Sequence, residues 1–191
     1  MSLTNPNGAP AATPALYAQR RAHLASLLGP KGIAIIPTAP EQQRNRDADF
    51  LYRHDSYFYY LSGFTEPKAY LVITGDGKTT LFCQPKDMER EIWDGYRLGP
   101  ADAPARLGVD AAASASELDA QMPALLDGRD AVWYPFATHK GLEACIDSVS
   151  RRAAGPRSLT ASKSSLVNLN SLSSCCASLA FSWASSSSCA F

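Results

Sequence analysis

The alternation of apolar and polar positions divides this chain into short helices and strands. In residues 14–28 the apolar side chains share one broad helical face, while Arg20 and Arg21 fall in the polar part. Thr13-Pro14 supplies an N-cap and a proline for the first helical position, and Gly29-Pro30 is a stop signal. The pattern therefore predicts an amphipathic helix between these two dipeptides.

Short runs of apolar or β-branched residues predict the strands. The continuous run 32–37 is typical of a strand that is covered on both faces. Gly75-Asp76-Gly77 separates two strand-like runs, and an Asp-Gly step between such runs indicates a hairpin. The two runs of this hairpin are predicted as strands at residues 68–74 and 78–83, and further strands are predicted at 108–110 and 131–134.

The middle of the chain combines a short helix, a loop and a second helix. Residues 86–92 are predicted as a short helix, and the proline-rich stretch 100–104 as a loop. Ser114-x-x-Glu117 has the form of a capping box in front of an apolar helix, which Pro123 must break or kink.

The order of the elements predicts the fold class. Thr138 is expected to cap a last helix, with apolar residues at Leu142, Ile146 and Val149, that ends at Gly155-Pro156. Helices and strands thus alternate along the chain, with one hairpin among them. We predict an α/β domain with a mixed sheet flanked by helices.

Composition and charge narrow the functional classes. The 191 residues include 18 basic and 18 acidic side chains, so the formal net charge is zero, and no run of like charge stands out. This excludes the electrostatic footprint of a nucleic-acid-binding or anionic-membrane-binding protein. The N-terminus lacks the basic and apolar regions of a secretory signal, and no apolar run is long enough to span a bilayer, so a cytoplasmic location is expected.

Two motifs stand out for their density of aromatic and charged residues. Residues 46–67 read RDADFLYRHDSYFYYLSGFTEP, in which 57–61 is predicted as a short buried strand that ends in a fixed turn. Residues 82–100 read FCQPKDMEREIWDGYRLGP. In order and spacing the two motifs resemble the N-terminal domain of Xaa-Pro aminopeptidases (aminopeptidase P), in the creatinase/prolidase group of metallopeptidases. The resemblance covers roughly residues 15–157.

The resemblance implies a fold, a reaction and separate roles for two domains. Members of this family release the N-terminal residue ahead of a proline by metal-assisted hydrolysis, with Mn(II) held by carboxylates and a His in a separate catalytic domain. That domain is not in this sequence, so we expect no bound metal and no peptidase activity from this chain alone. The intact enzyme is expected to be a homo-oligomer that binds peptides with proline in second position. The N-terminal domain would then restrict access to the active site and build subunit contacts.

Two other functions stay open at this point. Prolidase, which cleaves Xaa-Pro dipeptides, shares the first motif, whereas the second motif fits aminopeptidase P better. A stand-alone protein-interaction module, with the aromatic surfaces as its binding site, is the alternative from a different class.

The candidate site residues lie in the second motif. By resemblance, residues 91–97 form a loop close to an active site, often that of a neighbouring subunit. Trp93 would give an apolar wall of the substrate channel and Arg97 a positive charge near its entrance, while Gly95 would permit a tight turn. The alternative is that Trp93 is a core residue beside Ile92.

Other chemistry finds little support in the sequence. Asp47, Asp49, His54 and Asp55 lie close together, but the interleaved Arg44, Arg46 and Arg53 favour local ion pairs over a metal site, and His54 is expected to cap or pack. His23 and His139 are expected to be surface or boundary residues. Cys83 and Cys145 are expected to be buried free thiols. The chain has no Gly-x-Ser-x-Gly motif of a serine hydrolase.

Both ends of the chain differ in composition from the domain between them. Residues 1–12 are rich in Pro, Ala, Asn and Gly and are predicted to be disordered, so the domain is placed at 13–157. Residues 158–191 contain thirteen Ser and three Cys, and no Asp or Glu follows Asp147. We interpret this tail as aberrant or frame-shifted, with a natural low-complexity tail as the alternative. The other reading frames of the encoding DNA would decide between the two.

Overall fold

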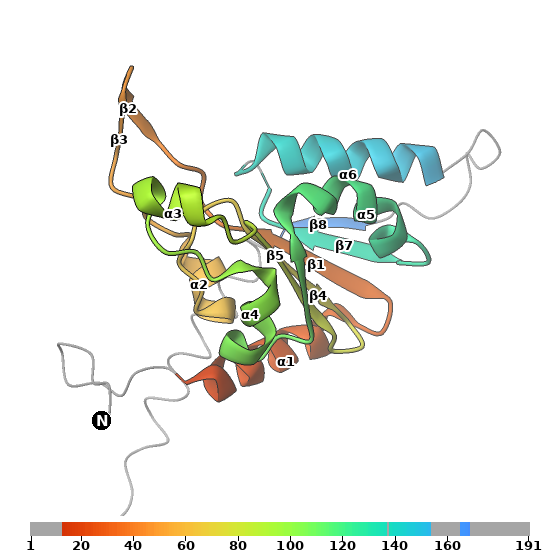
Figure 1. Ribbon diagram of the computed structural model, residues 1–191. Coiled ribbons are helices and arrows are strands. Elements are labelled where there is room, and N and C mark those ends of the chain that lie inside the picture. The colour runs from red at the N-terminus through yellow and green to blue at the C-terminus, as the bar shows by residue number, and fades with distance from the viewer. Residues whose placement is uncertain (1–12, 137, 154–164, 169–191) are drawn as a thin grey trace, which may run out of the picture.

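The computed structural model describes residues 13–136, 138–153 and 165–168, which form a six-stranded sheet with helices on both faces (Figure 1). The strands of this sheet, in spatial order, are β6 (Ala111–Ser114), β5 (Thr79–Cys83), β4 (Tyr70–Thr74), β1 (Gly32–Pro37), β7 (Ala131–Tyr134) and β8 (Ser165–Asn168). A separate two-stranded ribbon consists of β2 (Gln43–Asn45) and β3 (Ala48–Asp49), and it extends away from the sheet. The helices are α1 (Pro14–Leu28), α2 (Ser56–Ser62), α3 (Met88–Asp94), α4 (Gly99–Leu107), α5 (Leu118–Leu126) and α6 (Lys140–Ala153), with a 3-10 turn at Ala115–Glu117.

The strand directions confirm the predicted mixed sheet. β1 pairs antiparallel with β4 and β4 antiparallel with β5, which forms the hairpin predicted from the Asp-Gly turn. β1 with β7, β5 with β6 and β7 with β8 are parallel pairs. Parallel neighbours need crossover connections, and the helices between these strands supply them.

The central strand β1 divides the core into two layers. All six of its residues are buried, as its continuous apolar run predicts. Ala34 and Ile36 belong to the cluster that packs under α1, α2 and α4, whereas Ile33 and Ile35 belong to the cluster under α5 and α6. Side chains alternate across a strand, so one apolar run fills both layers.

Helix α1 has the predicted bounds, but the prediction for Arg21 was wrong. The residue is 3% exposed, on the same face as Tyr17 and Leu24. Its guanidinium donates to the carbonyl oxygens of Leu61 (3.0 Å), Leu107 (3.4 Å) and Gly108. Burial lowers the pKa of Arg21, and the charge of Asp110 opposes this shift. The cation is tolerated inside because backbone carbonyls at two helix ends take up its donors.

The aromatic run 57–61 is a helix, α2, and not the predicted buried strand. Asp55 is its N-cap, and its Oδ1 accepts a hydrogen bond of 2.9 Å from the Phe58 amide. Gly63 ends the helix at φ 68° with a hydrogen bond to the Tyr59 carbonyl. The buried residues of this helix, Phe58, Leu61 and Ser62, lie on one face, and both ends are capped. Together these two features override the β propensity of the aromatic residues.

The predicted loop at 100–104 is the first part of helix α4. Pro100 occupies the first turn, where no amide donor is required, and Pro104 lies inside the helix. Gly108 adopts φ 61° and caps the helix by donating to the Pro104 carbonyl. The strand predicted at 108–110 therefore begins only at Ala111.

The helices α5 and α6 form as predicted, but with different caps. The Ser114 hydroxyl contacts the Ser116 hydroxyl at 2.8 Å and makes no cap hydrogen bond, and α5 continues past Pro123 to Leu126. At α6 the Thr138 hydroxyl donates to the Pro135 carbonyl, while His139 Nδ1 accepts from the Leu142 amide at 3.2 Å. His139 is thus the side-chain cap of α6.

Several predictions concern residues outside the described ranges. These are the disordered N-terminus at 1–12, the helix stop at Gly155-Pro156, and most of the tail 158–191. One tail segment is described, as Ser165–Asn168 form β8 and pair in parallel with β7. The sequence pattern did not predict this strand.

Candidate functional site

The second motif forms helix α3 and a loop of residues 95–98, here called the α3–α4 loop. Asp87 caps the helix, since its Oδ1 accepts from the amides of Glu89 (3.1 Å) and Arg90 (3.2 Å). The prediction of a short helix at 86–92 is confirmed, with a shift of two residues toward the C-terminus.

Trp93 is exposed to solvent. Its side chain is 87% exposed and that of Ile92 is 78% exposed, so the alternative of a core Trp beside Ile92 is wrong for this chain. Met88 and Tyr96 are also exposed. Large apolar side chains at neighbouring positions on the surface mark contacts with a ligand or a protein more often than a freely solvated helix.

The α3–α4 loop turns at Gly95 and is held by Glu91. Gly95 adopts φ 86°, a conformation that favours glycine, as the sequence predicts for a tight turn. Its amide donates to the Glu91 carbonyl at 3.1 Å. The Glu91 side chain accepts a second hydrogen bond, of 3.2 Å, from the Arg97 amide. Arg97 therefore lies in a loop whose backbone is bonded to α3 at two points.

A second carboxylate, that of Glu66, holds the other end of this loop. Glu66 Oε1 accepts a hydrogen bond of 2.8 Å from the Leu98 amide, while Oε2 is buried and has no hydrogen-bond partner. Burial raises the pKa of Glu66. The Leu98 hydrogen bond and the Arg97 charge lower it, and the Glu91 charge raises it further. The sequence analysis missed Glu66 and Glu91, although both lie within the two motifs, because their partners are not visible from spacing.

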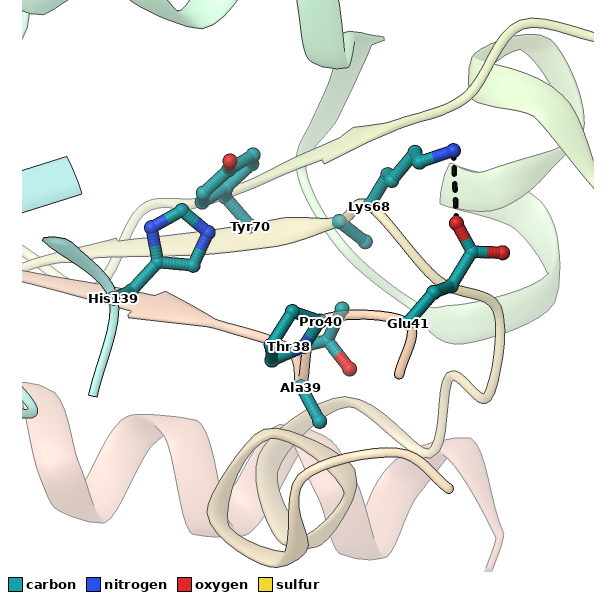
Figure 2. Close-up of a pocket in the computed structure, with 8 residues that line it drawn as sticks. Thr38, Ala39, Pro40, Glu41, Lys68, Tyr70 and His139 are labelled. Atoms are coloured by element: carbon teal, nitrogen blue, oxygen red, sulfur yellow. Dashed lines mark ion pairs between the residues drawn. The ribbon is translucent and has the colours of Figure 1, made fainter. Parts of the chain in front are cut away.

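A hollow of about 250 Å³ lies beyond the carboxyl end of β1, beside the start of β4 and His139 (Figure 2). Lys68 and Glu41 form an ion pair of 2.8 Å at its rim, and the His139 ring meets the Tyr70 ring edge-on at 5.6 Å. A smaller hollow of about 150 Å³ adjoins it and shares His139. Carboxyl ends of parallel strands often bind ligands. This hollow offers hydrogen-bond donors and one paired cation, but no nucleophile beside a base.

The acidic residues of the first motif do not converge. Asp49 lies on β3 with Asp47 just before that strand, whereas Asp55 caps α2 and His54 stacks on Tyr59 with a centroid distance of 4.4 Å. The prediction that His54 packs is confirmed. The predicted ion pairs are not formed, since none of the ion pairs between described residues involves Asp47 or Asp49.

A metal ion finds no suitable set of ligands in the part of the chain that the structure describes. No group of three or more His, Cys, Asp or Glu side chains there is placed to hold one. Mn(II) prefers several converging oxygen ligands, so the described residues do not fit this ion.

No described helix is long and apolar enough to cross a membrane.

The two described cysteines differ. Cys83 is fully buried, and burial, with the charge of Glu66, raises its pKa to about 11, so the thiol is protonated at neutral pH. Cys145 is only half-buried, and its Sγ donates to Asp119 Oδ1 at 3.4 Å. Neither residue has the environment of a reactive nucleophile.

Comparison with known proteins gives a consistent result. The family described as "Aminopeptidase P, N-terminal domain" matches residues 17–133. The chain is 37% identical over 136 residues to an Xaa-Pro aminopeptidase of Escherichia coli K12, and 31% identical over 135 residues to Xaa-Pro aminopeptidase 3 of Homo sapiens. These alignments cover 69% and 63% of this chain, but only 31% and 27% of the relatives.

The solved structures agree with the sequence relatives. The structure of E. coli aminopeptidase P with the inhibitor Pro-Leu superimposes with a TM-score of 0.75 at 32% identity, over 83% of this chain and 37% of that one. A variant of the same enzyme with a bound substrate also gives a TM-score of 0.75. The chain thus spans about a third of the length of the proteins that it matches.

Proposed function

The chain belongs to the family of aminopeptidase P N-terminal domains, and from this premise we propose that it serves as the access and oligomerisation domain of an Xaa-Pro aminopeptidase. The enzyme would release the N-terminal residue of peptides that have proline in second position. The curated relatives reported above carry the aminopeptidase name, which favours this function over prolidase.

The exposure of Trp93 is the observation that carries the proposal. An indole that is 87% exposed on a capped helix offers apolar surface to a substrate side chain or to a neighbouring subunit. Arg97, on the loop that follows, would place a positive charge near the entrance of the channel. Both roles rest on the match between this motif and the family.

By resemblance to the family, the metal chemistry belongs to the separate catalytic domain and not to the residues described here. Mn(II), where bound, would activate a water molecule for attack on the peptide bond. The described residues do not fit this ion, so we propose no catalytic step on them and expect the chain alone to be inactive.

The activity of the purified chain is the first test. The chain is incubated with an Xaa-Pro peptide and Mn²⁺, and its metal content is measured in parallel. We expect neither hydrolysis nor stoichiometric metal. Hydrolysis that a chelator abolishes would contradict the proposal and would make Asp47, Asp49 and His54 the first residues to mutate.

The role of Trp93 needs a complete enzyme. We propose a chimera in which residues 13–157 replace the matching segment of the E. coli relative. If the chimera is active, Trp93→Ala should raise KM several-fold with little change in kcat, and Trp93→Phe should lie between the two. An unchanged KM in Trp93→Ala would remove Trp93 from the substrate channel.

A stand-alone interaction module is the second candidate function. The exposed apolar residues in and after α3 favour it, because such residues are common at protein interfaces. Copurification of a partner that is lost in Trp93→Ala, with no response to Xaa-Pro peptides in the chimera, would favour this function.

A further inference from the structure

We infer that Glu66 is a positioning residue for the α3–α4 loop and thereby for Trp93 and Arg97. Glu66 accepts its hydrogen bond from a backbone amide, and the charge of Arg97 lowers its pKa. It acts through the backbone of Leu98, which lies just beyond Arg97. The consequence for peptide binding rests on the proposed function, whereas the positioning itself does not.

Glu66 is itself held on a rigid support. It follows the buried Phe64, and the carbonyl of the next residue, Pro67, accepts a hydrogen bond of 3.2 Å from Gln84. Gln84 directly follows β5, so the chain on either side of Glu66 is anchored to the sheet or the core. A positioning group requires such a support, because a mobile residue would not fix its partner.

The loop is attached at both ends. At its start, the Gly95 and Arg97 amides are bonded to Glu91. At its end, Glu66 accepts from the Leu98 amide, and the Leu98 side chain is buried in the core under α4. Helix α3 is short and largely exposed, so the direction of Trp93 depends on these attachments.

The environment of Glu66 argues against a purely stabilising role. One carboxylate oxygen is buried without a hydrogen-bond partner, and the negative charge of Glu91 partly offsets the positive charge of Arg97 nearby. A carboxylate in such a place costs desolvation free energy, which an apolar side chain would avoid. What the carboxylate supplies in return is an acceptor for one specific backbone amide.

Hydrogen exchange and Trp93 fluorescence test the inference on the chain itself. Glu66→Ala removes the acceptor, and Glu66→Asp keeps the charge on a side chain one methylene shorter. Glu66→Gln keeps an acceptor oxygen without the charge. The matched control is Glu89→Ala, an exposed carboxylate on α3. The fluorescence of Trp93 is obtained by subtracting the spectrum of the same protein with Trp93→Phe.

We expect the Leu98 amide to exchange at least about tenfold faster in Glu66→Ala and Glu66→Asp, the size of effect expected for a lost hydrogen bond to a charged group. The fluorescence anisotropy of Trp93 should fall in the same two variants, because the exposed indole would gain local motion while its solvation stays the same. Glu66→Gln and Glu89→Ala should resemble the parent in both measurements.

Three outcomes would overturn the inference. Exchange at Leu98 that is unchanged in Glu66→Ala and Glu66→Asp would show that the acceptor is not needed. Exchange at Leu98 that is as fast in Glu66→Gln as in Glu66→Ala would show that the charge of the carboxylate, and not its acceptor oxygen, protects the amide. Faster exchange with unchanged Trp93 anisotropy would show that the loop does not position the indole. An unchanged KM for Trp93→Ala in the chimera would instead refute the substrate role of Trp93 and leave the positioning intact.

Discussion

The guanidinium of Arg21 donates a hydrogen bond of 3.0 Å to the carbonyl oxygen of Leu61, forty positions further along the chain. The same guanidinium reaches the carbonyls of Leu107 and Gly108 at the end of α4. One side chain of α1 thus joins the C-terminal ends of two other helices on this face of the sheet. Those carbonyls have no partner within their own helices, which is why a cation is accommodated among apolar neighbours.

Replacing Arg21 should therefore strongly destabilise the domain. Arg21→Leu fits the apolar surroundings but leaves buried carbonyls without donors, and we expect a loss of about 3 kcal/mol in the free energy of unfolding. Urea unfolding measures it. The control is Arg20→Leu, whose more exposed guanidinium lies over the Tyr60 ring and bonds the Tyr60 carbonyl. We expect a loss below about 1 kcal/mol there, and equal losses in the two variants would contradict the assignment.

Gly63 should tolerate substitution less well than Gly77. It adopts φ 68°, and an added Cβ would lie 2.5 Å from the Tyr17 ring. Gly63→Ala combines backbone strain with this clash, so we expect a loss of about 2 kcal/mol or more. Gly77→Ala at φ 89° has open space around it and should show only the backbone cost, about 1 kcal/mol. Thermal unfolding of the two variants compares them directly.

The stability of the domain should depend on the ionisation of Glu66. Its pKa is raised above the ordinary value of 4.5, chiefly by burial, so the folded state binds a proton that the unfolded state releases more readily. The contribution of Glu66 is fully present below pH 4.5 and is lost as the pH rises through the folded pKa. Glu91 adds to this shift, while Arg97 and the Leu98 amide oppose it.

Glu66→Gln removes that ionisation and provides the measurement. Unfolding of parent and variant is followed by urea from pH 4 to pH 8. The variant should gain stability relative to the parent as the pH rises above the unfolded value. A difference that stays constant over this range would contradict the raised pKa.

His139→Ala should weaken the start of α6. The imidazole Nδ1 is the acceptor for the Leu142 amide, so we expect a loss of about 1 kcal/mol, typical of a removed N-cap. Thr138→Ala should cost less, because its hydroxyl bonds Pro135 and not the helix. A larger loss of stability in Thr138→Ala than in His139→Ala would show that Thr138 caps α6, as the sequence predicts. Chemical denaturation of the two single variants settles the order.

Sequence patterns predicted the central strands of the sheet and four of the six described α-helices, but not the strand β8 or the helices α2 and α4. The apolar run of β1 and the Asp-Gly hairpin are local signals, and both predictions are confirmed. Helix α2 was missed because its aromatic residues favour strands, and only the caps at Asp55 and Gly63 decide against one. Arg21 was placed on the polar face because spacing alone does not reveal that two other helices end against it.

The residues of the candidate site were also predicted only in part. Trp93 and Arg97 were predicted from a motif, and their role in a substrate channel stays a prediction, whereas the exposure of Trp93 excludes the core alternative. Glu66 and its partner Leu98 are thirty-two positions apart. No spacing rule links a carboxylate to a backbone amide at that distance in the chain, so the relationship becomes visible only in the folded domain.

Because Cys83 is buried, chemical modification of its thiol reports transient opening of the domain. The thiol is fully enclosed on β5, and its pKa of about 11 leaves almost no thiolate at neutral pH. An alkylating reagent can modify it only after the sheet separates from its covering helices. The rate at which the Cys83 peptide acquires label, read by mass spectrometry, therefore measures how often the domain opens under native conditions.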